Sequence, residues 1–102
     1  MIRHDQAEGH FVYMLRCRGN RLYTGYAVNV EQRYRKHCAG LAAHFTRAFP
    51  PEELLGAVAM PDRSTALRLE AAIKKLDRQG KEQLIPFLRV GNAKALISIL
   101  PF

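Results

Sequence analysis

Long apolar segments are missing from this sequence. The longest uninterrupted apolar stretches are about seven residues, whereas a helix that crosses a bilayer needs about 20. The opening segment, MIRHDQAEGH, also contains no apolar signal core. These absences argue against a membrane protein or a secreted precursor, and we expect a cytoplasmic protein without a membrane partner.

Cysteine is scarce as well. The two cysteines, Cys17 and Cys38, show no CxxC spacing, and the four histidines are scattered along the chain. Isolated thiols of this kind are typical of reduced cysteines rather than of a disulfide framework or a zinc site. Internal repeats, Ser/Gly-rich linkers and runs of like charge are missing too. We therefore expect one domain, 1–102, with a single modest core.

Acidic residues are outnumbered, since 16 Lys and Arg stand against 9 Asp and Glu, which gives a net charge of +7 and a pI near 9.9. The excess lies in residues 1–51, which carry eight basic against three acidic residues, while the remainder carries eight against six. Such a field favours polyanions such as nucleic acid, although many basic proteins have other functions. Charge alone therefore leaves the function open.

Two segments rich in β-branched and aromatic residues, 11–17 and 22–28, flank a short RGNR turn. Because Gly19 and Asn20 suit a tight turn, this pattern predicts a β-hairpin. Asn29 followed by Gln32 resembles a capping box and predicts a helix that Gly40 ends.

The second half predicts one more strand and several helices. Residues 41–53 contain two prolines and are expected to form a loop, and the apolar segment 54–60 is expected to form a third strand. The cluster Pro61-Asp62-Arg63-Ser64 predicts the start of a helix that continues through 66–76. A short helix at 81–85 and a last helix at 93–100 complete an α/β (α+β) domain, with a small, mainly antiparallel three-stranded sheet flanked by helices.

Three features of the hairpin could carry chemistry. Tyr13 and Tyr23 lie on its two strands and can approach each other there, although tyrosines also serve simply to pack a sheet. Gly25 interrupts the second strand, where glycine is unfavourable, which indicates a bulge or the close approach of a ligand.

Charged residues on the helices are open to two interpretations each. Arg33 and His37 are four residues apart and share a helix face, which could equally be a solvated basic face. Glu70 stands three residues from both Leu67 and Ile73, beside the predicted buried stripe. A carboxylate there needs a partner, which could be an arginine, Lys74 or a metal ion.

In this order and spacing, the residues resemble the GIY-YIG nuclease superfamily, in particular its small, single-domain, bacterial YhbQ-like (UPF0213) branch. The resemblance covers about residues 11–85 as a nuclease core and leaves 86–102 as a C-terminal helical extension. The positions that carry it are Val12-Tyr13, Tyr23-Thr24-Gly25, Arg33, His37 and Glu70.

The resemblance implies a role for each of these side chains. Tyr23 would be the general base that activates water, with Tyr13 alongside it. Arg33 would stabilise charge on the phosphate, His37 would assist proton transfer or position the water, and Glu70 would hold one Mg²⁺ or Mn²⁺ ion, bound weakly without substrate. Six residues are expected to contact substrate: Gly25, Arg35, Lys36, Thr46, Arg47 and Lys74.

The implied activity is a divalent-metal-dependent endonuclease that acts on nucleic acid, on DNA in preference to RNA, in repair or recombination, as a monomer. Two departures from the family pattern remove positive charges that could bind substrate. Tyr26 stands where several branches have lysine, and the loop after the first helix reads GLAAHFTR at 40–47, without the lysines usual there. Two alternatives therefore remain: a nucleic-acid-binding module with an inefficient or vestigial site, and an interaction protein in which these residues only pack the domain.

Overall fold

The structure is a computed structural model that describes residues 8–100. Its centre is a sheet of three antiparallel strands, β1 (His10–Cys17), β2 (Arg21–Ala27) and β3 (Pro51–Met60). The strand order is β2-β1-β3, so β1 is hydrogen-bonded on both sides and β2 and β3 are the edges. The expected α+β class with a small antiparallel sheet is confirmed.

The hairpin between β1 and β2 forms as predicted. Gly19 and Asn20 have φ angles of 76° and 58°, the left-handed conformation that glycine and asparagine tolerate best. Cys17 pairs with Arg21 on either side of the turn. The turn residues therefore set the register that places Tyr13 opposite Gly25.

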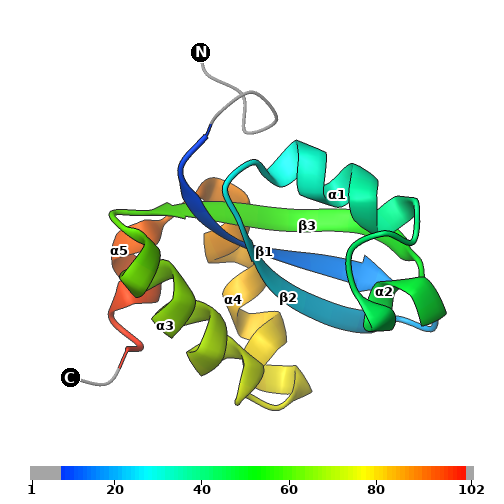
Figure 1. The fold of residues 1–102 in the computed structure, drawn as a ribbon. Helices are drawn as coiled ribbons and strands as arrows, with labels where there is room; N and C mark the ends of the chain where they lie inside the picture. The colour runs from blue at the N-terminus through cyan, green and yellow to red at the C-terminus, as the bar shows by residue number, and fades with distance from the viewer. Residues whose placement is uncertain (1–7, 101–102) are drawn as a thin grey trace.

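Helices α1 (Val30–Cys38) and α2 (His44–Ala48) cover one face of the sheet (Figure 1). The Asn29 side chain accepts a hydrogen bond of 3.0 Å from the backbone N–H of Gln32, which confirms the predicted cap. Gly40 follows the helix with a φ of 75°, as expected of a residue that ends it.

The prediction of an unbroken loop over 41–53 is wrong, because this segment contains α2 and the start of β3. Phe45 and Phe49 of this segment pack against the buried aromatic cluster of the sheet, and this burial stabilises a helix too short to be stable alone. Pro51 begins β3 because proline is tolerated at the first residue of an edge strand.

Helices α3 (Arg63–Lys74), α4 (Arg78–Val90) and α5 (Ala93–Ile97) cover the opposite face. The Asp62 carboxylate caps α3 by accepting from the Thr65 backbone N–H at 2.7 Å, so the predicted helix start is confirmed. The buried stripe of α3 differs from the prediction. Leu67 is 38% exposed, and the buried side chains are those of Ala66, Leu69 and Ile73.

α4 contains both residues that were expected to bracket a shorter helix. Gly80 stands in its first turn, where its backbone N–H donates to the capping Asp77 carboxylate at 2.8 Å, and Pro86 lies in its interior. Packing offsets the cost of proline, because Gly56 on β3 lets the α4 backbone come close: a Cβ on residue 56 would lie 2.6 Å from the Leu88 carbonyl carbon.

The C-terminal helices pack into the same hydrophobic core as the sheet. The expected division after residue 85 falls inside α4, and the last helix ends at Ile97 rather than continuing to residue 100. Leu84, Leu88 and Leu96 of these helices belong to the core that also contains β1 and β3 side chains. Over the described range 8–100, no helix is long and apolar enough to cross a membrane.

The contact between Tyr13 and Gly25 yields a test of the fold. In Gly25→Ala, the new Cβ would lie 2.6 Å from Cζ of Tyr13 and closer still to its hydroxyl oxygen. We expect overpacking to lower the free energy of unfolding by about 1–3 kcal/mol in urea titrations. Gly9→Ala is the matched control, since its Cβ would meet the Phe11 ring at 3.4 Å. Equal stability of the two variants would contradict the packing described.

Candidate active site

Tyr13, Tyr23 and His37 lie in mutual contact on the sheet face that α1 covers. The ring centroids of the two tyrosines are 6.4 Å apart, and the His37 ring lies 5.8 Å from Tyr13 and 5.0 Å from Tyr23. Tyr13 comes from β1, Tyr23 from β2 and His37 from the last turn of α1. The fold thus brings together three of the five residues expected to be catalytic.

A chain of hydrogen bonds runs from this cluster into α2. The Tyr13 hydroxyl lies 2.6 Å from Nε2 of His37, and Nδ1 of His37 lies 2.7 Å from Oγ1 of Thr46. The Thr46 hydroxyl donates to the Ala43 carbonyl at 3.3 Å. Because Thr46 donates there, it accepts from His37 Nδ1–H, which leaves Nε2 to accept from the Tyr13 hydroxyl.

Burial sets the protonation states of this chain. Tyr13 and His37 are each 1% exposed. Burial raises the pKa of the Tyr13 hydroxyl well above its usual value, with Tyr23 and Glu70 adding to the rise and Arg33 opposing it. Burial, helped by the Arg33 charge, lowers the pKa of His37. Both groups are therefore neutral near pH 7, as the hydrogen-bond directions require.

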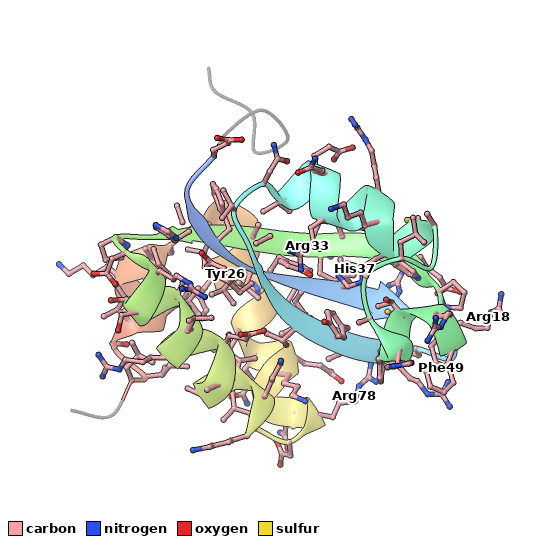
Figure 2. The ribbon with its side chains drawn as sticks, viewed as in Figure 1. Arg18, Tyr26, Arg33, His37, Phe49 and Arg78 are labelled. Carbon is pink, nitrogen blue, oxygen red and sulfur yellow. The ribbon has the colours of Figure 1, made fainter. Side chains whose placement is uncertain are left out.

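Arg33 and Glu70 act electrostatically on Tyr13 from helices that cover opposite faces of the sheet. Arg33 projects from α1 toward the strands beside His37 (Figure 2). Glu70 on α3 acts electrostatically on Tyr13 and forms an ion pair with Lys74, with 3.1 Å between Oε2 and Nζ. Its side chain is 18% exposed. Lys74 is therefore the partner that the structure shows for this carboxylate, among the three possibilities of an arginine, Lys74 or a metal ion.

Two of the residues expected to contact substrate have internal partners instead. Thr46 is 1% exposed and bonds to His37, so it cannot reach a substrate. Gly25 is buried under Tyr13, so the close approach inferred at this glycine comes from a side chain rather than a ligand. The other four are exposed: Arg35, which forms an ion pair of 3.3 Å with Glu31, and Lys36, Arg47 and Lys74.

The family of this chain follows from its similarity to known proteins. Residues 9–83 match the family model described as the GIY-YIG catalytic domain. The chain belongs to the GIY-YIG family. It is thereby a member of a family of nucleases, and the matched range 9–83 includes Tyr13, Tyr23, Arg33, His37 and Glu70.

Several relatives carry the name UPF0213 protein. The chain is 41% identical over 76 residues to UPF0213 protein BH0048 of Halalkalibacterium halodurans, covering 74% of this chain and 81% of that protein. It is 44% identical over 80 residues to UPF0213 protein OB0043 of Oceanobacillus iheyensis, covering 78% and 93%. A solution NMR structure of UPF0213 protein BH0048 from Bacillus halodurans shares the fold, with a TM-score of 0.52 and 37% identity over 85% of this chain and 90% of that chain.

In the part of the chain that the structure describes, the carboxylate that acts on the tyrosine cluster is that of Glu70. Within residues 8–100, no group of three or more His, Cys, Asp and Glu side chains could hold an ion. Glu70 offers carboxylate oxygen, the ligand type that Mg²⁺ and Mn²⁺ prefer, and part of its side chain is accessible. A single carboxylate is compatible with an ion held mainly by water and substrate.

Helix α2 supports the cluster in a way that the sequence did not predict. Phe45 packs on Tyr23 with ring centroids 5.6 Å apart, and Thr46 orients His37. Neither contact follows a local spacing, because α1 and α2 meet only through the tertiary fold. In the sequence, the one indication of this role was the pair Phe45-Thr46, an aromatic residue next to a hydroxyl residue, in a segment that was expected to be a loop.

The lowered pKa of His37 predicts a pH-dependent stability. A histidine with an ordinary unfolded-state pKa near 6.5 takes up a proton more readily when unfolded, so the stability it contributes is complete above about pH 6.5. That contribution is lost as the pH falls through the lower folded-state pKa, by up to about 1.4 kcal/mol per pH unit.

His37→Gln is the comparison variant, because glutamine can accept from Tyr13 and donate to Thr46 but does not titrate. Urea unfolding at about pH 7.5 and pH 5 measures the change. We expect the free energy of unfolding to fall more in the wild-type protein than in the variant. A parallel decrease in both proteins would show that His37 does not carry the effect.

Proposed function

We propose that the protein is a divalent-metal-dependent endonuclease that hydrolyses phosphodiester bonds of nucleic acid. The observation that carries the proposal is the contact of Tyr13, Tyr23 and His37, with the charges of Arg33 and Glu70 close enough to act on Tyr13. Hydrolysis needs an activated water, neutralised phosphoryl oxygens and a stabilised leaving alkoxide. These five side chains offer a group for each requirement.

The two tyrosines have different roles in this proposal. Tyr13 is fully buried and donates to His37, so it holds its proton and serves to position the site. Tyr23 is half-buried, so part of its side chain is accessible to solvent, and in this proposal Tyr23 is the general base that activates water. His37 is 1% exposed with both ring nitrogens occupied, and it therefore acts through Tyr13 rather than on the water itself.

Arg33 and Glu70 act on the phosphate from either side. The exposed guanidinium of Arg33 can bind phosphoryl oxygens and stabilise the charge that develops on them. Glu70 would hold one Mg²⁺ or Mn²⁺ ion together with water and substrate oxygens. When bound, that cation neutralises the phosphate and stabilises the leaving alkoxide.

Charge supports nucleic acid as the partner. Residues 1–51 carry eight basic against three acidic residues, and this half of the chain contains Tyr13, Tyr23, Arg33 and His37. Contacts to phosphate position a protein without reading bases, so we expect low sequence specificity. We favour DNA over RNA, a role in repair or recombination, and a monomer acting in the cytoplasm.

One observation favours the second candidate, a nucleic-acid-binding module with a weak or vestigial site. The Glu70 carboxylate already has a cationic partner in Lys74, 3.1 Å away. An ion that binds Glu70 has to compete with this ammonium group. The half-exposed Lys74 can swing away at small cost, because surface ion pairs at this spacing contribute only about 0.3–0.5 kcal/mol.

Removing the Tyr23 hydroxyl tests the proposed base. In Tyr23→Phe, we expect cleavage to fall by about 10²- to 10⁴-fold, the usual contribution of a positioned general base, while the ring still packs. The assay uses labelled single-stranded, duplex and branched DNA and RNA with Mn²⁺ or EDTA. Tyr34→Phe removes a hydroxyl from another half-buried tyrosine that packs on the same core cluster and should cleave normally. Full activity of Tyr23→Phe would assign the base role elsewhere.

Glu70→Gln separates metal binding from ion pairing. The variant is nearly isosteric, so we expect it to fold and bind nucleic acid, and to lose Mn²⁺-dependent cleavage and the Mn²⁺ binding measured in the presence of substrate. Lys74→Gln breaks the same ion pair but keeps the carboxylate, so it should retain Mn²⁺ binding and Mn²⁺-dependent cleavage of bound substrate, even where loss of this lysine weakens substrate binding. If the two variants behave alike, Glu70 serves only the ion pair and the binding-module alternative is the better account.

A further inference from the structure

A second feature of the surface lies at the hairpin end of β2. A pocket of about 330 Å³ opens there, within the ~300–1,000 Å³ typical of ligand pockets. It is lined from three elements that are distant in sequence, by Arg21, Leu22, Phe45, Arg78 and Lys81. Figure 2 shows Arg78 just below the β2 ribbon, close to α2.

The lining is cationic, with three basic side chains and no acidic one. Two of the three are held in place by neighbours. The Arg21 guanidinium carbon lies 3.8 Å from the centre of the Phe49 ring, and Arg78 Nε donates to Glu82 at 2.6 Å. These contacts favour one position of each guanidinium group at the rim, and the Glu82 carboxylate balances part of the Arg78 charge.

Lys81 has no such neighbour. It is half-buried, and within residues 8–100 no carboxylate forms an ion pair with it and no hydrogen bond involves its ammonium group. The other charged groups that line the same pocket, Arg21 and Arg78, repel it. Without a carboxylate partner of its own and with two guanidinium groups lining the same pocket, Lys81 makes the site suited to an anion that would bind all three.

The pocket is continuous with the proposed catalytic cluster. Phe45 forms part of its wall and packs on Tyr23, with ring centroids 5.6 Å apart, and Leu22 directly precedes Tyr23 on β2. At about 3.3 Å per residue, the strand from Arg21 to the proposed base Tyr23 spans about 7 Å. A duplex strand carries one phosphate per ~3.4 Å of axis, so the pocket lies within about two nucleotides of the reacting position.

We propose that this pocket binds an unpaired nucleotide of the substrate strand beside the cleavage site. Its phosphate lies against Arg21, Arg78 and Lys81, and its base lies against Phe45 and Leu22. Phosphate contacts alone need no apolar wall, whereas aromatic rings are the usual platform for bases that have left a duplex stack. The inference rests on the proposed function and specifies its substrate class as a duplex with a single-stranded branch or tail.

Binding without cleavage tests the proposal. Fluorescence anisotropy in EDTA compares a labelled blunt duplex with the same duplex carrying a single-stranded tail, at several salt concentrations. We expect the wild-type protein to bind the tailed duplex more tightly. Lys81→Gln should lose this preference, and its slope of log affinity against log salt should fall by about 0.7–0.9, the value for one phosphate contact. Lys94→Gln, which removes an exposed lysine of α5, is the matched control and should keep both properties.

Phe45→Leu separates stacking from charge. We expect this variant to bind the tailed duplex about 5- to 100-fold more weakly, as for one lost base stack, with an unchanged salt slope. Circular dichroism verifies that each variant is folded, and Lys81→Gln alone carries the test if Phe45→Leu is not.

Two results would overturn the proposal. If Lys81→Gln weakens blunt and tailed duplexes equally, the pocket contacts a duplex phosphate and no unpaired base. If Lys81→Gln matches Lys94→Gln, the pocket is not part of the nucleic-acid surface. Neither result bears on Tyr23-dependent cleavage, so the nuclease proposal would stand. Conversely, a protein that prefers tailed duplexes but never cleaves them would overturn the nuclease proposal and leave the pocket proposal standing.

Discussion

The Tyr13 ring lies across Gly25 of the neighbouring strand, where a side chain of any other residue would collide with it. This contact holds the phenol flat against the sheet, so that its hydroxyl points to Nε2 of His37 at 2.6 Å. His37 in turn bonds to Thr46, so buried polar atoms that have partners join β1, α1 and α2, and the packing contact at Gly25 adds β2. Because an unpaired buried polar group is costly, the four elements are restrained to one arrangement.

The side chains on the two faces of the central strand β1 belong to different clusters. Val12 and Met14 face the core formed with α3 and α4, while Tyr13 and Leu15 face α1. Because successive side chains of a β-strand point to opposite faces, neighbouring residues of β1 can contribute one to the packed core and the next to the polar cluster, even in a chain of 102 residues. Edge strand β2 leaves Tyr23 half-buried at the boundary, and this difference in burial is the basis for the different roles proposed for the two tyrosines.

Sequence reasoning succeeded where local chemistry governs structure and failed where packing overrides it. Asn29 and Asp62 cap helices as expected, since a side chain that bonds the next turn acts within a few residues. Pro86 was expected to bound a helix and lies inside one, because burial of α4 against β3 outweighs one lost hydrogen bond. Leu67 was expected to be buried and is exposed, because hydrophobic spacing alone did not distinguish it from Leu69.

By itself, the sequence determined the hairpin, the helix starts and the ordered set of motif residues that relates the chain to the GIY-YIG family. Each of these depends on residues close together in the chain. Only the tertiary structure decided that Thr46 is buried against His37, that Glu70 pairs with Lys74, and that three cations from β2 and α4 surround one pocket. The physical reason is that hydrogen bonds, ion pairs and burial depend on distance in space, and residues from separate elements come together only when the sheet and its two helical layers are assembled.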